Sequence, residues 1–302
     1  MLWLIACVDG PGVSKHVSGE LTIAQLDLSS MSIGEAALVV GPDGTSVLID
    51  TGNDSHRDEV AEAVAATLGE ARVDWLLLTH YHADHIGGFG AVEVARGVVW
   101  RGRVDLTGDT NTDELEPIEG DVTLCDTSCD TWAADLGEGA SLEVVVAGGW
   151  VAGERLELGD DENARSLGGV VRWGDFTYWF GGDLTGGGKD TPDMETFVAE
   201  RLDVGPVDVL HLGHHGIDSA SNEAWLDAML GDNAIVGAND LYLAAPDDDV
   251  LDRVLARIGR GRVWVTEDGS LAGEGAEVAH GDVVVRVRDD GSYEINGEAF
   301  GP

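Results

Sequence analysis

The chain has 302 residues, 43% of them apolar, and carries 57 acidic against 17 basic side chains for a net charge of −40. Such a surface repels polyanions, so the composition argues against tight, sequence-independent binding of nucleic acid. No run approaches the roughly 18 apolar residues that a membrane-spanning helix needs. The acidity fits either a salt-adapted protein or ordinary solubility in a lineage poor in lysine.

The amino terminus suggests a targeting segment. Leu4-Ile5-Ala6-Cys7 fits the pattern at which bacterial lipoproteins are cleaved and lipidated on cysteine, and a stretch rich in Gly, Pro and Ser follows over 9–18 like a tether. The apolar stretch is short and lacks a positively charged start, so a disordered start of a cytoplasmic protein is the alternative. We expect residues 1–20 to be a signal or tether segment, and we favour export over a cytoplasmic location.

The next part of the chain predicts strands around one helix. Alternating or continuous apolar runs predict strands over residues 21–28, 36–40, 46–49 and 73–78. A Gly-Pro-Asp-Gly turn at 41–44 separates the second strand from the third. Apolar residues at helical spacing predict a helix over about 56–68. Strands and a helix in this order are typical of a layered α/β hydrolase site.

A heptapeptide rich in metal-ligand types, Thr79-His-Tyr-His-Ala-Asp-His85, directly follows the strand at 73–78. Imidazole nitrogens and carboxylate oxygens bind Zn²⁺ and similar divalent ions. Side chains at i and i+2 of an extended segment point the same way, so His80 and His82 can bind one ion. A turn at Ala83 would direct Asp84 and His85 toward a second ion. The alternative is a histidine-rich surface loop, which the preceding buried strand argues against.

Residues 101–139 are acidic, glycine-rich and weakly patterned, and we expect loops around short strands that cover the site. Cys125 and Cys129 lie there and can form a local disulfide or remain free thiols. The later predicted strands cover residues 142–147, 170–173, 176–180, 207–212, 234–236, 263–266, 283–287 and 292–295. The later predicted helices cover residues 194–202, 222–230 and 248–258. We find no internal repeat and no clear linker, which predicts a single domain over 21–302.

The chain resembles the metallo-β-lactamase superfamily in three motifs: the heptapeptide, Gly182-Asp183 after a strand, and His214-His215 after another strand. More narrowly, it resembles the hydrolase-like domain of ComEC-type DNA-uptake proteins and their free-standing relatives. That resemblance rests on Leu26-Asp27-Leu28 with Gly34-Glu35-Ala36, on Asn163-Ala-Arg-Ser166, and on Gly213-His-His-Gly216. It spans about residues 21–271.

The resemblance implies a four-layer αββα sandwich with two divalent metal ions at one edge, Zn²⁺ or alternatively Mn²⁺. His80 and His82 would bind the first ion, and Asp183 would bridge both ions. Many superfamily members supply a further histidine to the first ion, where this chain has Asn163. The ComEC-like subgroup also has asparagine there. The first site would therefore be the weaker of the two and better suited to Mn²⁺ than to Zn²⁺.

The resemblance further implies that Asp84 and His85 bind the second ion, which one of His214 and His215 would complete. The other histidine of that pair would face the substrate or act as a general acid. Asp84, His214 and His215 are thus the candidate catalytic residues. Asp50, at the end of the strand over 46–49, would orient a metal ligand rather than bind metal.

Three more residues are candidates for orienting a ligand or contacting the substrate: Asn163, Ser166 and His211. We expect three other histidines to be exposed and without a role: His16, His56 and His280.

Two divalent ions about 3.5–4 Å apart lower the pKa of a shared water and generate a hydroxide nucleophile, so a serine or cysteine nucleophile is not needed. The ions also reverse the local charge, which allows a phosphate-bearing substrate despite the acidic surface. The resemblance therefore implies a metal-dependent hydrolase of a small or single-stranded phosphoester, most simply a phosphodiester. The alternatives are hydrolysis of a lactone, thioester or β-lactam, and a non-catalytic metal-holding binding or signalling module.

Overall fold

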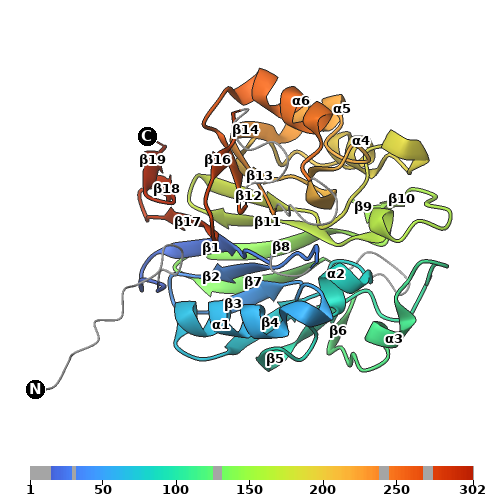
Figure 1. The fold of residues 1–302 in the computed structure, drawn as a ribbon, viewed down its shortest axis with the longest axis horizontal. Coiled ribbons are helices and arrows are strands. Elements are labelled where there is room, and N and C mark those ends of the chain that lie inside the picture. The colour runs from blue at the N-terminus through green and yellow to red at the C-terminus, as the bar shows by residue number, and fades with distance from the viewer. Residues whose placement is uncertain (1–14, 29–31, 125–130, 238–244, 268–274, 302) are drawn as a thin grey trace, which may run out of the picture.

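The computed structural model describes residues 15–28, 32–124, 131–237, 245–267 and 275–301. Within these ranges two sheets face each other and helices cover their outer sides (Figure 1). Cys7, Cys125 and Cys129 lie outside the described residues, and so do the predictions made for them. None of the described helices is long and apolar enough to cross a bilayer.

The first sheet contains nine strands within the described ranges, in the spatial order β19-β18-β17-β1-β2-β3-β4-β5-β6. Its strands are β1 (Leu21–Gln25), β2 (Ala37–Val40), β3 (Ser46–Ile49), β4 (Arg72–Leu77), β5 (Glu93–Trp100), β6 (Val122–Thr123), β17 (Val283–Val287), β18 (Tyr293–Ile295) and β19 (Glu298–Phe300). The strands from β3 to β6 run parallel. Since parallel strands end at the same edge, the segments after β3 and β4 lie side by side.

The second sheet has ten described strands, with β7 paired to β8 beside the path β10-β9-β8-β11-β12-β13-β14-β15-β16. Its strands are β7 (Trp132–Gly137), β8 (Ala140–Ala147), β9 (Trp150–Val151), β10 (Glu154–Arg155), β11 (Gly168–Trp173), β12 (Phe176–Phe180), β13 (Val207–His211), β14 (Leu230–Val236), β15 (Val263–Val265) and β16 (Glu277–Val278). The strands from β12 to β16 are parallel. The segments after β12 and β13 therefore also share an edge.

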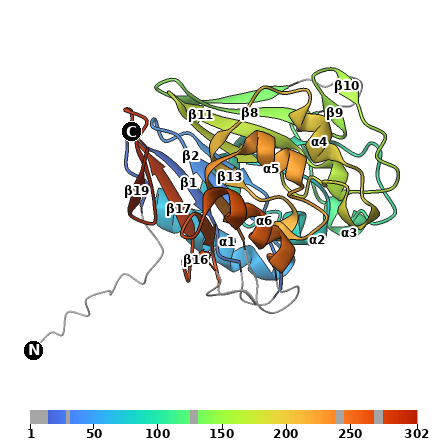
Figure 2. The same cartoon turned by 90° about the horizontal axis from the view of Figure 1, so that it is seen from above.

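Helices cover both sheets. The described α-helices are α1 (Arg57–Leu68), α2 (Ala83–Ile86), α3 (Thr112–Leu115), α4 (Met194–Ala199), α5 (Glu223–Met229) and α6 (Asp248–Ile258). Single 3-10 turns are η1 (Asp54–His56), η2 (Asn163–Arg165), η3 (Gly188–Asp190) and η4 (His214–Gly216). Seen from above, α4, α5 and α6 lie in front of the second sheet (Figure 2).

Both faces of each sheet are buried, which makes four layers. Val47 and Ile49 of β3 point into the core between the sheets, whereas Leu48 joins the core beneath α1. In the second sheet Val209 of β13 faces the first sheet, and Leu210 packs toward α4, α5 and α6. This alternation follows from the two-residue period of a strand. The predicted four-layer αββα sandwich is confirmed.

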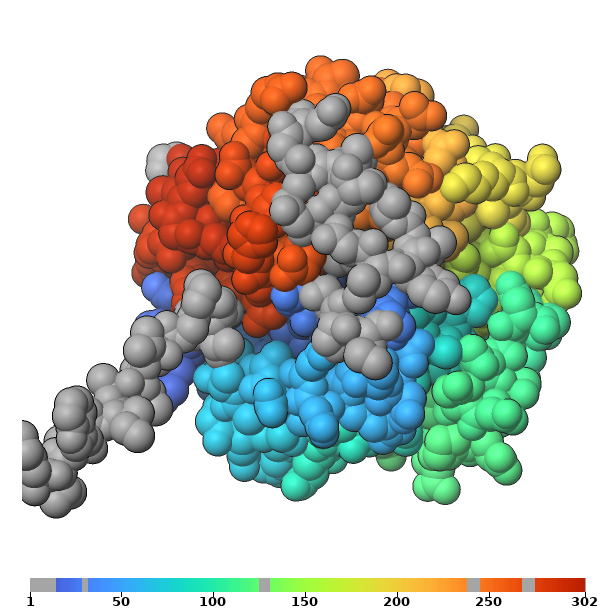
Figure 3. All heavy atoms as spheres, in the orientation of Figure 1, coloured from blue at the N-terminus to red at the C-terminus, as the bar shows by residue number. Residues whose placement is uncertain are grey.

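The space-filling view shows the two halves of the chain as two regions of the visible surface. The earlier part, blue to green, lies below, and the later part, yellow to red, lies above (Figure 3). The last strands of the chain, drawn in red, nevertheless belong to the sheet of the earlier part, because β17 pairs with β1 in the first sheet. The end of the described chain thereby returns to its beginning.

Most predicted elements appear close to their predicted bounds, and four predicted ranges match β3, β12, β17 and α6. The weakly patterned stretch 101–139 contains α3, β6 and β7 among loops, while the strand β5 was not predicted. The turn expected at Ala83 is the single helical turn α2. His56 is buried rather than exposed, so that prediction was wrong; its Nδ1 accepts a hydrogen bond from the backbone N–H of Asn53 at 3.1 Å.

Asp282 should make the stability of the fold depend on pH. Its carboxylate accepts a 2.9 Å hydrogen bond from the backbone N–H of Asp27. Burial outweighs that bond and raises the pKa of Asp282 to about 6. The carboxyl of an unfolded chain has a pKa of about 3.9, so between about pH 4 and 6 the folded protein binds more protons. The free energy of unfolding therefore falls as the pH rises through this window.

The isosteric change Asp282→Asn should remove this pH-dependent contribution to the free energy of unfolding, which is worth up to about 3 kcal/mol. The variant is expected to match the wild type near pH 4 and to exceed it in free energy of unfolding above about pH 6. Urea unfolding of both proteins across this range measures the difference. A difference that does not change with pH would contradict the expectation.

Candidate metal centre

Four parallel strands bring the candidate residues to one place. In the first sheet β3 leads to Asp50 and β4 to His80, and these two strands are parallel neighbours. In the second sheet β12 leads to Asp183 and β13 to the pair His214-His215, again from parallel neighbours. The carboxyl ends of parallel strands are the usual place for a ligand site in α/β folds.

The backbone at this edge is strained in ways that favour a functional role. Asp50, His214 and His215 all have positive φ angles, of 59°, 49° and 54°. Residues other than glycine rarely adopt this region, and such strain collects at functional sites. Gly182 also has a positive φ of 49°, and a Cβ there would lie 2.6 Å from Thr79 Oγ1. Glycine before Asp183 is thus required by the close approach of the heptapeptide.

A first group of possible metal ligands contains His80, His82 and Asp183. His80 Nε2 lies 3.2 Å from His82 Nδ1 and 3.6 Å from Asp183 Oδ2. His80 and Asp183 are buried, whereas the His82 side chain is 23% exposed. The other ring nitrogen of His82 lies 3.5 Å from Asp109 Oδ2, in the stretch expected to cover the site. Sequence reasoning had missed Asp109.

A second group contains Glu35, His85, Asp183 and His215, all buried. His85 Nε2 lies 3.2 Å from Asp183 Oδ1, and His215 Nε2 lies 3.9 Å from Asp183 Oδ2. Asp84 adjoins this group, with its Oδ2 3.4 Å from His215 Nε2. Asp183 belongs to both groups, which is the position expected of a bridging carboxylate. Glu35 had been noted in the sequence only as part of the motif Gly34-Glu35-Ala36, without a role.

His214 and His215 take different positions. His214 Nε2 lies 3.6 Å from Asp183 Oδ2 and 3.1 Å from the amide nitrogen of Asn163. Its Nδ1 lies 2.5 Å from Ser219 Oγ. The His214 side chain is 20% exposed, while that of His215 is 2% exposed. His215 therefore faces the buried second group, and His214 lies on the partly exposed side of the candidate centre, where the His82 side chain is also partly exposed; this side is called the mouth below.

Several residues hold the possible ligands in place. Asp50 Oδ2 lies 2.8 Å from His85 Nδ1 and accepts a 2.6 Å hydrogen bond from Thr79 Oγ1. Ser166 Oγ accepts a hydrogen bond from the backbone N–H of Asp183 at 3.1 Å. Asp50 and Ser166 thus lie where the sequence analysis expected orienting residues. His211 instead contacts Glu35.

Glu162, which sequence reasoning had also missed, connects the heptapeptide to the segment of Asn163. Its carboxylate is fully buried and accepts a 3.1 Å hydrogen bond from the backbone N–H of Tyr81, between the two first-group histidines. Arg101 donates to the same carboxylate from its guanidinium group. A buried ion pair with additional hydrogen bonds fixes geometry more than it adds stability. In the sequence, nothing distinguishes Glu162 from its acidic neighbours Asp160 and Asp161.

The unpaired polar atoms test whether metal ions fit here. His85 Nε2, Asp183 Oδ1 and His215 Nε2 are buried and form no hydrogen bond of good geometry; they face one another and Asp84, in charge contacts of 3.2–3.9 Å. Buried polar atoms of this kind are costly unless something satisfies them. Imidazole nitrogens and a carboxylate oxygen converging within 4.8 Å are a suitable donor set for a divalent ion. The residues present therefore fit a pair of ions that share Asp183.

The charge states also suit metal binding. Burial lowers the pKa of His80 well below its usual value, so its imidazole is neutral and has a lone pair to donate. Burial opposes ionisation of Asp183, but the facing histidines, His85 foremost, hold its pKa well below the usual range. Burial likewise opposes a charge on His85, yet Asp183 and Asp50 raise its pKa well above the usual value. A metal ion at His85 must therefore displace a proton, so we expect metal affinity to rise with pH.

Asp50→Asn should weaken metal binding without removing a ligand. Losing the charge behind His85 reduces the basicity of that imidazole, and such changes typically lower metal affinity by roughly 10–100-fold. Competition with a chromophoric chelator measures the affinity. Asp74→Asn is the matched control, because Asp74 accepts a hydrogen bond from the backbone N–H of Ser46, at the other end of the same two strands. Equal losses in the two variants would contradict the role given to Asp50.

Comparison with known proteins decides the family. Residues 34–238 match the sequence profile of the metallo-beta-lactamase superfamily. The chain belongs to this superfamily. It combines the metallo-beta-lactamase fold with a buried cluster of His, Asp and Glu, the residue types that hold divalent metal ions. The cluster is consistent with a binuclear metal site.

Individual relatives of this superfamily are distant. A beta-lactamase-like protein 2 homolog of Drosophila melanogaster is 29% identical over 117 residues, which make up 38% of this chain and 40% of that protein. The chain thus matches about two fifths of the length of this curated relative. A metallo-beta-lactamase with a HARLDQ motif from Cronobacter sakazakii is 17% identical, over 62% of this chain and 70% of the other, with a TM-score of 0.39. A diphosphatase of the PhnP family is 15% identical, over 88% and 98%, with a TM-score of 0.42.

Proposed function

We propose that this metallo-beta-lactamase-fold protein hydrolyses phosphodiesters, with two divalent ions held by the two groups of ligands. His80, His82 and Asp183 would hold the first ion. Asp84, which adjoins the second group, would hold the second ion together with His85, Asp183 and His215, while Glu35 would not be a ligand. The bound ions would supply an acidified water and polarise the phosphoryl oxygens. Asn163 in place of a further histidine favours Zn²⁺ in the second site and leaves the first site open to Mn²⁺.

The position of His214 is the observation that carries the proposal. The ring lies at the mouth, close to Asp183, and its Nδ1 is held by the hydroxyl of Ser219 at 2.5 Å. With Nδ1 so engaged, Nε2 is the nitrogen on the side of the candidate centre, 3.1 Å from the Asn163 amide nitrogen, and a bound substrate would displace that contact. When water attacks phosphorus and the bond to the departing oxygen breaks, His214 donates its proton to that oxygen. Alkoxides of ordinary phosphodiesters are poor leaving groups, so this proton matters for them.

The narrower resemblance to ComEC-type domains supports the phosphodiester as substrate. Glu35, Asn163 and Ser166 belong to the motifs of that subgroup, and all three lie at or beside the candidate centre. The net charge of −40 favours a small or single-stranded substrate over a duplex.

The arginines near the centre argue against a β-lactam, whose carboxylate is best held by a cation. Arg101 is turned inward onto Glu162. Arg165 donates to the backbone carbonyl oxygens of Asp161 and Gly159. Both guanidinium groups are thus engaged away from the mouth.

We also propose that residues 21–302 form one hydrolase domain. Pairing of β1 with β17 supports this, because the first and the last parts of the described chain then complete one sheet. Separating them would expose the edges of both strands.

The direct test of the proposed function is a substrate panel. The protein, loaded in turn with Zn²⁺ and Mn²⁺, is assayed with a chromogenic phosphodiester, a phosphotriester, a lactone and a β-lactam, and bound metal per chain is measured in parallel. We expect two ions per chain and turnover of the phosphodiester. Turnover of the β-lactam or the lactone alone would refute the phosphodiesterase. Two bound ions without any turnover would instead favour a metal-holding binding module.

A further inference from the structure

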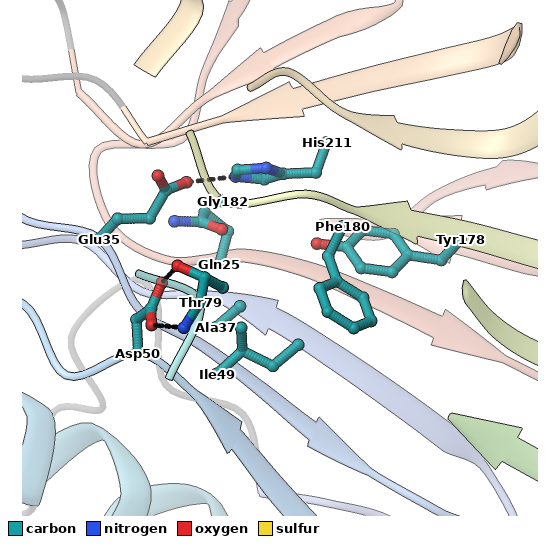
Figure 4. Close-up of a pocket in the computed structure, with 10 residues that line it drawn as sticks. All are labelled: Gln25, Glu35, Ala37, Ile49, Asp50, Thr79, Tyr178, Phe180, Gly182 and His211. Carbon is teal, nitrogen blue, oxygen red and sulfur yellow. Dashed lines mark hydrogen bonds and ion pairs between the residues drawn. The ribbon is translucent and has the colours of Figure 1, made fainter. Parts of the chain in front are cut away.

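Glu35 and His211 face each other in the wall of a small pocket (Figure 4), and Glu35 also lies close to His215 of the candidate metal centre. Glu35 lies just before β2 of the first sheet, and His211 is the last residue of β13 in the second sheet. His211 Nε2 contacts Glu35 Oε1, and both side chains are 5% exposed. The contact therefore joins the two sheets at the edge that carries the possible metal ligands.

The second oxygen of Glu35 faces a candidate ligand. Glu35 Oε2 lies 3.6 Å from His215 Nδ1. The other nitrogen of the same ring, Nε2, lies 3.4 Å from Asp84 Oδ2 and 3.9 Å from Asp183 Oδ2. The imidazole of His215 thus turns one nitrogen to the other ligands and the opposite nitrogen to Glu35. The geometry points to Glu35, held in place by His211, as the positioning residue that orients His215 for the second metal ion.

The physical reason is the same as for Asp50 and His85. A histidine that binds metal through one nitrogen commonly donates its other N–H to a carboxylate, which fixes the ring and increases its basicity. His85 has such a carboxylate in Asp50, 2.8 Å from its Nδ1. With Glu35 behind His215, both histidines of the second group are backed by buried carboxylates.

The first group is supported differently. His80 Nδ1 lies 3.2 Å from the hydroxyl of Thr79, a neutral partner. The carboxylate near His82 belongs to Asp109, whose side chain is 51% exposed and therefore screened by water. The proposal thus predicts two sites of unequal affinity, and it assigns the tighter binding to the second.

A small cavity lies beside the pair, with Glu35 and His211 in its lining. It offers about 20 Å³ to the centre of a water molecule, enough for one water. Gln25 and Tyr178 line it with side-chain polar atoms that form no hydrogen bond in the described structure, so such a water has partners of its own. Among its lining residues, which all lie in the described ranges, His211 is the sole one able to carry a positive charge. Glu35 therefore depends on its histidine neighbours for charge compensation.

The experiment compares Glu35→Gln with the wild type. Glutamine keeps the size of the side chain and removes its charge. We expect the dissociation constant of the second Zn²⁺ to rise roughly 10–100-fold while that of the first stays unchanged, measured by stepwise chelator competition. The unfolding temperature of the metal-free protein should be nearly that of the wild type, whereas the increase caused by Zn²⁺ should shrink. If Glu35 only contributed to packing, Glu35→Gln would instead lower the unfolding temperature with and without metal.

Two further variants sharpen the result. Glu195→Gln is the matched control, since Glu195 is also fully buried but accepts hydrogen bonds from the backbone N–H groups of Ser221 and Asn222. It should change the unfolding temperature without changing either dissociation constant. Because His211 acts through Glu35, His211→Gln should weaken the second ion in the wild type and add nothing in the Glu35→Gln background.

The outcomes separate the two proposals. The role of Glu35 rests on the proposed metal centre and not on the class of substrate. A wild-type protein that binds fewer than two ions overturns the centre itself. Wild-type affinities in Glu35→Gln overturn the positioning role, and so does complete loss of the second ion at every metal concentration, which would make Glu35 a ligand.

Discussion

Asp183→Ala is expected to abolish both metal binding and hydrolysis. Asp183 is the sole residue common to both groups of possible ligands in the described structure, and its two oxygens face His80 on one side and His85 on the other. Its removal takes a negative charge from both sites at once. Substituting a residue that only orients a ligand lowers metal affinity by roughly 10–100-fold, so the loss of a ligand shared by both sites should lower it further.

Metal per chain after desalting and the rate with a chromogenic phosphodiester are the two measurements. The matched control is Asp175→Ala, in the exposed turn between β11 and β12, at the other end of the strand that leads to Asp183. It should retain both ions and the full rate. If Asp183→Ala kept its metal and its activity, the centre would lie elsewhere and the assignment of both groups would be wrong.

His214→Ala should separate catalysis from metal binding. His214 is at the mouth, held by Ser219 and beside Asn163, whereas His215 lies buried among the second group. We expect His214→Ala to keep two ions and lose a factor of about 10²–10⁴ in kcat, as for a missing general acid. His215→Ala should instead lose the second ion.

The leaving group distinguishes proton donation from a general loss of structure. A nitrophenolate departs without needing a proton, so with that substrate His214→Ala should lose much less rate than with an alkyl phosphodiester. KM should change less than kcat, because the proton is transferred in the transition state. His280→Ala, at a histidine whose side chain is 64% exposed, serves as the control. Equal losses with both leaving groups would contradict a general acid at His214.

Much of the fold could be predicted from the sequence because its signals are local. The apolar runs of β3 and β17 and the acidic start of α6 at Asp248 mark their own bounds. The strand β5 escaped prediction because three residues of its first half, Glu93, Ala95 and Arg96, are exposed, and it takes its place by pairing with β4. His56 was misjudged for a similar reason, since its burial depends on the approach of Gly34 and Gly52.

The candidate site likewise contains residues that a local motif reveals and residues that only the fold brings together. The heptapeptide places four possible ligands within six positions, so the sequence alone indicates metal binding. Glu35 gave no comparable signal, because a lone acidic residue before a strand is ordinary in so acidic a chain. Its relation to His211 and His215 exists only after the two sheets have stacked.

The sequence by itself thus indicated most of the elements, the superfamily and a histidine and aspartate motif, because each depends on neighbours along the chain. The tertiary structure decided which of two adjacent histidines faces inward: the His215 side chain is 2% exposed among the second group, whereas that of His214 is 20% exposed. It also decided that buried carboxylates back both histidines of the second group. Asp50 reaches His85 from the neighbouring strand of the same sheet, and Glu35 reaches His215 from the opposing sheet, so no spacing along the chain encodes either contact.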